Sequence, residues 1–184
     1  LKIGLKKYLS EHSKKVKVLD IATGTGRTLQ QIQSALPQVE LYGLDLSGSY
    51  LKQASKYLSS RSGDLVQLTK GNAEKMPYAS DSFQALTCVF LFHELPREAR
   101  QNVLNECFRL LEPGGTLVLA DSIQIEDSPK FKPIMENFHK IFHEPYYRDY
   151  IVDDINLRLE ESGFSSITSE SHFMTKVWKA NKPI

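Results

Sequence analysis

The sequence has little that would indicate a secreted, membrane-spanning or nucleic-acid-binding protein. Two cysteines occur in 184 residues, Cys88 in an apolar run and Cys107 on a helical stripe. Such cysteines are typical of buried thiols in a reducing, cytoplasmic setting rather than of a disulfide. No apolar run approaches the roughly 20 residues that a membrane span needs. The 23 basic and 22 acidic residues leave a net charge of +1, so no basic surface for a nucleic acid is expected.

What the sequence does contain is an alternation of short apolar runs and amphipathic stretches. Strands are expected at residues 16–21, 39–45, 65–69, 83–92, 116–120, 164–169 and 172–180. Helices are expected within 2–12 and 126–150, after Gly26, after a Ser47 cap, from Pro96 to Glu112, and from Asp153 to Gly163. We expect Gly114 and Gly115 to supply the left-handed turn that ends the Pro96 helix.

This alternation predicts an α/β fold. It favours a doubly wound, mostly parallel seven-stranded sheet in a single domain of residues 1–184. The last two strands are expected to form a hairpin, with the final strand antiparallel. Leu1 is not a methionine, which is compatible with a chain that lacks upstream residues.

Residues 20–26 are the most informative stretch of the chain. Asp20 stands near the end of the first expected strand, Gly24 and Gly26 follow, and Leu29 begins an apolar stripe of helical period. In an open α/β sheet, ligands bind at the carboxyl ends of the strands, where glycines let them approach the backbone. The stretch therefore predicts a ligand site, with an ordinary structural turn as the alternative.

Two classes of ligand compete for this turn. The dinucleotide pattern GxGxxG/A needs a small third residue, so that the helix packs closely and a pyrophosphate rests on its N-terminus. Here that position is Leu29, which disfavours an NAD-dependent oxidoreductase. Asp45, at the end of the second strand, can accept hydrogen bonds from two ribose hydroxyls. A ligand with a ribose and no phosphate satisfies both observations.

Four blocks in this order resemble a class I S-adenosylmethionine-dependent methyltransferase, of the small-molecule (type 11) group that includes the quinone-ring methyltransferases. The blocks are Val18-Leu-Asp-Ile-Ala-Thr-Gly-Thr-Gly26, Gly43-Leu-Asp-Leu-Ser47, Gly71-Asn-Ala-Glu-Lys-Met-Pro77 with Asp81-Ser-Phe83, and Leu111-Glu-Pro-Gly-Gly-Thr-Leu117. The resemblance covers most of residues 15–121 and implies the Rossmann-like methyltransferase fold, S-adenosyl-L-methionine as cofactor and methyl transfer to a small molecule.

The resemblance also implies which residues contact the cofactor. They are Asp20, Ala22, Thr23, Gly24, Gly26, Asp45, Leu46, Asn72, Ala73, Val89 and Phe90. Asp20 would take up the amino group of the methionine end and Asp45 the ribose hydroxyls, with Leu46 packed on the adenine. The family usually has Asp where this chain has Asn72, whose amide oxygen can still accept a bond from the adenine amine. Val89 and Phe90 would line the reactive side of the cofactor.

Methyl transfer needs a base only when the attacking atom must lose a proton. His93, just past the fourth strand, is the candidate catalytic residue, and the alternative is that it orders a loop or caps a helix. His139, His143, Tyr146 and Tyr147 are weaker candidates whose spacing is first explained by packing. No constellation of His, Cys and Asp indicates a metal.

The acceptor side of the site is expected to come from residues 126–150. This inserted segment carries the apolar stripe Phe131, Met135, Phe138 and Phe142, and we expect it to roof the acceptor pocket. Its aromatic residues are compatible with an apolar or aromatic acceptor. No Asn/Asp-Pro-Pro-Tyr follows the fourth strand, so a nucleic-acid acceptor is not expected. The alternative function is a methyltransferase-like domain that binds the cofactor as a non-catalytic regulatory or interaction module.

Overall fold

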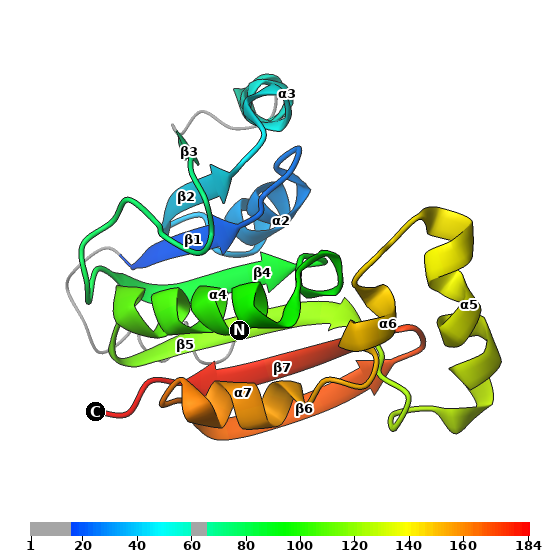
Figure 1. Cartoon of the computed structure of the whole chain (residues 1–184). Coiled ribbons are helices and arrows are strands. Elements are labelled where there is room, and N and C mark those ends of the chain that lie inside the picture. Colours follow the sequence, from blue (N-terminus) through cyan, green and yellow to red (C-terminus); the bar gives the residue numbers. More distant parts are fainter. Residues whose placement is uncertain (1–15, 60–65) are drawn as a thin grey trace.

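A single sheet organises the chain in the computed structural model, which describes residues 16–59 and 66–184 (Figure 1). Its strands follow the order β3-β2-β1-β4-β5-β7-β6. They are β1 (Lys17–Ile21), β2 (Glu40–Asp45), β3 (Gln67–Lys70), β4 (Phe83–Val89), β5 (Leu111–Ser122), β6 (Ser165–His172) and β7 (Thr175–Asn181). β1 to β5 pair in parallel, and β7 is antiparallel to both of its neighbours. The predicted fold class is confirmed.

Helices cover both faces of the sheet. They are α2 (Arg27–Ala35), α3 (Gly48–Ser59), α4 (Arg97–Leu110), α5 (Lys132–Phe142), α6 (Tyr147–Tyr150) and α7 (Ile155–Glu161), with the 3-10 turns η1 (Phe92–Glu94) and η2 (Pro129–Phe131). Val18 packs in one apolar cluster with Leu29 of α2, whereas Leu19 belongs to a second cluster with Val103 of α4. Because consecutive strand residues face opposite sides, β1 is buried on both.

Several local features predicted from the sequence are present in the structure. Ser47 caps α3 by accepting a hydrogen bond from the Tyr50 backbone N–H at 3.3 Å, and Pro96 is the residue before the first turn of α4. Cys88 and Cys107 are buried free thiols. No helix among residues 16–59 and 66–184 has the length and hydrophobicity to cross a membrane. The helix expected within 2–12 lies outside the described residues.

The expectation for the end of α4 is wrong. The helix stops at Leu110, and Leu111 already has the extended geometry of β5 (φ −71°, ψ 137°). Gly114 does adopt a positive φ of 81°, but inside β5, where its N–H donates to the Lys182 carbonyl. Gly114 therefore bends the chain near the start of β5, next to the register shift between β4 and β5. It does not cap the helix.

Several other boundaries also differ from the expected ranges, among them those of β5, β6 and β7, and for two elements the cause is local. β4 ends at Val89 and not at residue 92, because Phe90 turns the chain with a φ of 55°. α7 begins at Ile155, and its cap is Asp154, which accepts from the Leu157 N–H at 3.0 Å. Asp153, the expected start, is used in an ion-pair network described below.

β6 and β7 form the expected hairpin, joined by Phe173 and Met174, so β6 is one edge of the sheet. Every residue of β6 except the half-buried Ile167 is exposed. α5 and α6 stand beyond the carboxyl ends of β4 and β5, near the β6–β7 turn (Figure 1). This arrangement places residues 126–150 at the edge where the candidate site lies.

Candidate functional site

The glycine turn after β1 leaves open space at one glycine and not at the other. A Cβ added at Gly24 (φ 54°) would meet no atom within 4 Å. A Cβ at Gly26 (φ 81°) would lie 3.2 Å from both Ala54 Cβ and Leu58 Cδ1 of α3. Gly24 therefore offers a free approach to the backbone, whereas the need for glycine at position 26 comes from packing between helices. Ala22 also has a positive φ of 54°.

The fold accommodates Leu29, the large residue at the third position of the glycine pattern. Its side chain is fully buried, and a Cβ on Gly43 of β2 would lie 2.7 Å from Leu29 Cδ1. Gly43 thus leaves room for the leucine, so α2 packs closely on the sheet although the small residue sits on the strand instead of the helix. Gly43 lies in the second of the four sequence blocks, but no role was predicted for it.

Asp20 is a buried acid at the carboxyl end of β1. Its carboxylate accepts hydrogen bonds from the Thr23 hydroxyl at 2.7 Å and from the Thr87 hydroxyl of β4 at 2.6 Å. Burial raises the pKa of Asp20 to about 6, although the two hydroxyls favour the ionised form. A carboxyl group that loses its proton near pH 6 is suited to receive a cationic group, since that cation would favour its ionised form. Thr87 was not among the predicted site residues.

Asp45 holds the glycine turn and the start of the next helix together. One carboxylate oxygen accepts from the Gly24 N–H at 2.8 Å and the other from the Ser47 N–H at 2.8 Å. A carboxylate offers about four lone-pair positions, so two remain for a ligand. Beside it, Leu46 exposes 69% of its surface.

The loop after β3 carries Asn72 and Ala73. The Asn72 side-chain oxygen accepts from the Glu74 N–H at 2.9 Å, which forms a tight turn and leaves the amide NH2 group as a donor. The amide oxygen keeps a second lone pair for the predicted bond to an adenine amine. Ala73 is half-buried against the core.

The end of β4 turns outward. Val89 is half-buried and Phe90 exposes 50% of its surface, with its N–H bonded to the Ala120 carbonyl at 2.8 Å. The left-handed φ of Phe90 is rare for an aromatic residue and aims its ring away from the core. The Phe90 and His93 rings meet edge to face, with centroids 6.3 Å apart.

His93 is paired with an acid that the sequence analysis missed. Its Nδ1 lies 2.7 Å from Asp121 Oδ1, and the Phe92 N–H donates to Asp121 Oδ2 at 2.8 Å. Burial of the imidazole opposes protonation, but the hydrogen bond and negative charge of Asp121 outweigh it, so the pKa of His93 is raised. Asp121 could have been found, because it ends a strand that neighbours β4 at the same sheet edge.

Two more acids approach His93. Possible ligand atoms of His93, Glu94 and Glu144 lie within 4.8 Å of one another. Burial and the Glu144 charge raise the pKa of Glu94, while His93 lowers it. The expectation that no metal is bound stays a prediction, and we assign no ion to these side chains.

Residues 126–150 join this region through aromatic rings. Phe142 stacks on Phe138 at 4.4 Å, Phe138 lies 4.5 Å from Tyr147, and Tyr147 meets His93 at 6.0 Å between centroids. Tyr147 is buried with its hydroxyl 2.7 Å from Ser122 Oγ, whereas Tyr146 is exposed. His139 lies in α5, and His143 is exposed at its C-terminal end.

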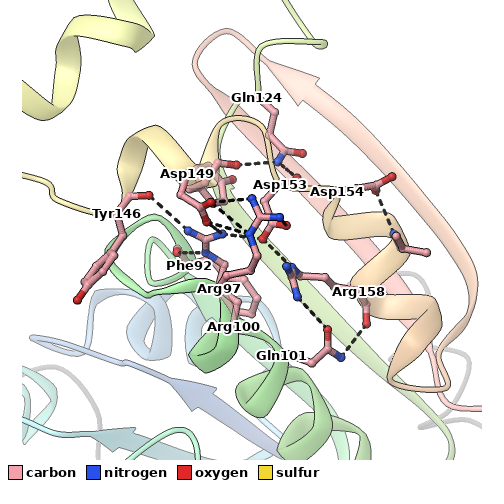
Figure 2. A network of polar contacts seen from close by, with 12 residues as sticks. Phe92, Arg97, Arg100, Gln101, Gln124, Tyr146, Asp149, Asp153, Asp154 and Arg158 are labelled. Carbon is pink, nitrogen blue, oxygen red and sulfur yellow. Dashed lines mark hydrogen bonds and ion pairs between the residues drawn. The ribbon is translucent and has the colours of Figure 1, made fainter.

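A buried arginine connects residues 126–150 to the turn after β4 (Figure 2). Arg100 of α4 is fully buried, and its Nε donates to the Phe92 carbonyl at 3.0 Å. Its Nη1 donates to Asp153 at 2.6 Å and to Asp149 at 2.8 Å. Arg97 and Arg158 complete the network around the same two acids. Arg100 lies on the buried face of α4 beside Ala99. An arginine on the apolar face of a predicted helix is the sequence feature that could have indicated this buried ion pair.

The fold and the glycine turn after β1 are those of a Rossmann-like α/β domain. A family model described as "Methyltransferase domain" matches residues 18–115. The chain belongs to this family, which confirms the resemblance to S-adenosylmethionine-dependent methyltransferases.

Curated relatives and solved structures agree. A demethylmenaquinone methyltransferase of Thermotoga maritima is 37% identical over 105 residues, covering 57% of this chain and 43% of the relative. One of Anoxybacillus flavithermus is 31% identical over 141 residues, covering 72% and 59%. The chain thus spans about half the length of these relatives.

A solved structure of a Haemonchus contortus phosphoethanolamine N-methyltransferase in complex with S-adenosyl-L-methionine has a TM-score of 0.70 at 14% identity. The match includes 100% of this chain and 52% of that structure's chain. A structure from Bacillus halodurans C-125 has a TM-score of 0.75 at 19% identity, covering 98% of this chain and 99% of that one. At these identities the likeness concerns the fold.

Proposed function

We propose that this chain binds S-adenosyl-L-methionine and transfers its methyl group to a small-molecule acceptor. The observation that carries the proposal is the pair of acids, Asp20 and Asp45, on adjacent strand ends beside the open backbone at Gly24. One acid suits an ammonium group and the other suits ribose hydroxyls, at a turn that departs from the dinucleotide pattern at Leu29.

The residues present fit this cofactor. Asp20 would hold its amino group, and the backbone of Ala22, Thr23, Gly24 and Gly26 would follow its methionine end. The two free lone-pair positions of Asp45 would accept the ribose hydroxyls. The exposed Leu46 would cover one face of the adenine, whose edge would meet Asn72 and Ala73. Val89 and Phe90 would lie toward the methyl group. When bound, the cofactor supplies an activated methyl on a positively charged sulfur.

Calorimetry with S-adenosylhomocysteine and NAD tests the cofactor. We expect S-adenosylhomocysteine to bind and NAD not to bind at the same concentration. Tighter binding of NAD would contradict the proposal. A screen of candidate acceptors with labelled S-adenosylmethionine then tests turnover, and absence of methyl transfer to every class of acceptor would favour a non-catalytic module.

We propose further that the acceptor is an apolar or aromatic small molecule, covered by residues 126–150. Relatives named demethylmenaquinone methyltransferases support an aromatic acceptor, and the aromatic run from Phe142 to His93 supports its location. A cover is needed, because the sheet supplies only a floor and water must be kept from the reacting atoms.

Phe138→Ala tests the cover. We expect a rise of about tenfold in KM for the acceptor with an unchanged Kd for S-adenosylhomocysteine, because the ring lies in the inserted segment and not at the glycine turn. Leu157→Ala is the control, since Leu157 is 50% exposed on α7, outside residues 126–150. An equal change in both variants, or loss of cofactor binding in a folded Phe138→Ala protein, would contradict this division of roles.

A further inference from the structure

His93 is held in one orientation from several sides. The Phe92 N–H donates to Asp121 Oδ2 at 2.8 Å, and the Phe92 carbonyl accepts from the buried Arg100. The imidazole meets the rings of Phe90, Tyr147 and Tyr150 edge to face. A side chain restrained this way loses little freedom when it acts on a bound molecule.

The pairing with Asp121 selects one tautomer. An ionised carboxylate can only accept hydrogen bonds, so the 2.7 Å contact means that Nδ1 carries the hydrogen. Asp121 is fully buried and also accepts from the Ser122 N–H at 2.7 Å, which fixes its orientation. Nε2 is then the free basic nitrogen, and a positive charge formed on the ring lies against a buried negative one.

The other groups around His93 decide which acceptors fit. Glu94 of η1 and Glu144, between α5 and α6, add two acids, and Tyr147 and Tyr150 of α6 are phenols. The nearby cation, Arg100, is already paired with Asp149 and Asp153. An acceptor that arrives as an anion would meet three carboxylates, so it would be repelled.

We propose that His93 is the catalytic base that takes a proton from the acceptor, that Asp121 is its positioning residue, and that the acceptor enters as a neutral, proton-bearing nucleophile instead of an ionised carboxylate. This inference rests on the proposed function. The acceptor atom forms a bond to the methyl carbon, the carbon–sulfur bond breaks with its electron pair kept by sulfur, and the acceptor proton moves to Nε2 of His93.

The first test is a pH titration of the His93 imidazole by NMR, which needs no acceptor. The chain has five histidines, and the His93 signal is the one lost in His93→Gln. We expect its midpoint above the ordinary value of 6.5 in the unmodified protein and at lower pH in Asp121→Asn. Glu98→Gln, on the exposed side of α4, should leave it unchanged. A midpoint that Asp121→Asn does not move overturns the positioning role.

The second test measures methyl transfer from labelled S-adenosylmethionine to demethylmenaquinol, 2-naphthol and 2-naphthoate. We expect transfer to demethylmenaquinol or 2-naphthol and none to 2-naphthoate, which is ionised at neutral pH. His93→Gln should lower kcat by about a hundredfold or more, with Kd for S-adenosylhomocysteine within about twofold. Asp121→Asn should lower kcat and move the acid limb of its pH profile to lower pH, whereas Glu98→Gln should leave both unchanged.

Three results would overturn the proposal while leaving the methyltransferase assignment intact. The first is full turnover by a folded His93→Gln protein, and the second is transfer to 2-naphthoate as fast as to 2-naphthol. The third is activity lost on treatment with a chelator, because His93 would then be a metal ligand and not a base. Failure of the unmodified protein to bind S-adenosylhomocysteine would instead contradict the proposed function, and the NMR titration would still decide the role of Asp121.

Discussion

The two sides of the candidate site hold their polar groups in different ways. At the glycine turn, Thr23 lies three residues from Asp20 and Gly24 lies 21 residues from Asp45, while one bond, from the Thr87 hydroxyl of β4 to Asp20, joins residues 67 apart. At the turn after β4, Asp121 lies 28 residues from His93, and Asp153 lies 53 residues from Arg100. The first side is assembled by three adjacent strands of the sheet, β2, β1 and β4, and their turns, whereas the second exists only when α4, β5 and α6 have packed together. The difference predicts that mutations will separate cofactor binding from the integrity of the acceptor side.

Arg100→Met should have the largest effect on stability. It removes a buried charge that Asp149 and Asp153 share and frees the Phe92 carbonyl. Arg158 still pairs with Asp153, so we expect a loss of about 3 kcal/mol in unfolding free energy and a fall of roughly 10 °C in Tm. Thermal denaturation measures it.

Arg97→Gln is the matched control, because Arg97 pairs with the same Asp149 but its side chain is 51% exposed. An exposed pair contributes about 1 kcal/mol or less. Equal losses in the two variants would show that burial of Arg100 is not what holds the acceptor side.

Asp45→Ala should have the largest effect on the cofactor side. The change removes the expected acceptor for ribose hydroxyls together with the bonds to the Gly24 and Ser47 N–H groups. We expect Kd for S-adenosylhomocysteine to rise about ten- to a hundredfold, or about 1.5–3 kcal/mol. Asp45→Asn keeps one oxygen acceptor and should cost less. Unchanged binding in Asp45→Ala would mean that the ribose lies elsewhere.

The pH dependence of S-adenosylhomocysteine binding tests the role of Asp20 on the cofactor side. Burial raises its pKa to about 6, and the amino group of the cofactor pairs with the ionised form, so affinity for S-adenosylhomocysteine should fall about tenfold per pH unit below about pH 6. Asp20→Asn should bind more weakly and lose this dependence. Calorimetry between pH 4.5 and about 8 checks it, and a flat profile in the unmodified protein would contradict the role of Asp20.

The same pKa has a consequence for the free protein. Because the folded-state pKa is above the unfolded one, the stability linked to Asp20 is present at low pH and is lost as pH rises through about 6. Asp20→Asn should therefore raise Tm at alkaline pH relative to its effect at acid pH.

The smallest effects are expected for alanine substitutions at Gly24 and Gly26, which should differ in kind. Gly24→Ala places a methyl group in open space at a left-handed φ, so it should cost about 1 kcal/mol in stability and weaken cofactor binding. Gly26→Ala pushes the methyl against Ala54 and Leu58, so it should lower Tm further. Equal losses of binding at equal Tm would contradict the assignment of Gly24 to the ligand and Gly26 to packing.

The same contrast explains what the sequence could predict. Asp20, Asp45 and Gly24 stand in short motifs, where spacing along the chain implies spacing in the fold, and the sheet order followed from strand–helix alternation. Asp121 and Arg100 gain their roles from partners far along the chain, so no window of sequence contains both members of either pair. Gly114 misled the prediction because a left-handed residue serves a strand as well as a helix end.

The outer strand β6 has a consequence for how copies of this chain meet. An edge strand offers unpaired N–H and C=O groups on which another chain could build. Here the strand reads Ser165-Ser-Ile-Thr-Ser-Glu-Ser-His172, with Ile167 as its one aliphatic side chain. A second strand added there would bury serines, a glutamate and a histidine in place of apolar area, so its hydrogen bonds would gain little support from side chains. This border of the sheet is therefore protected against strand-by-strand aggregation.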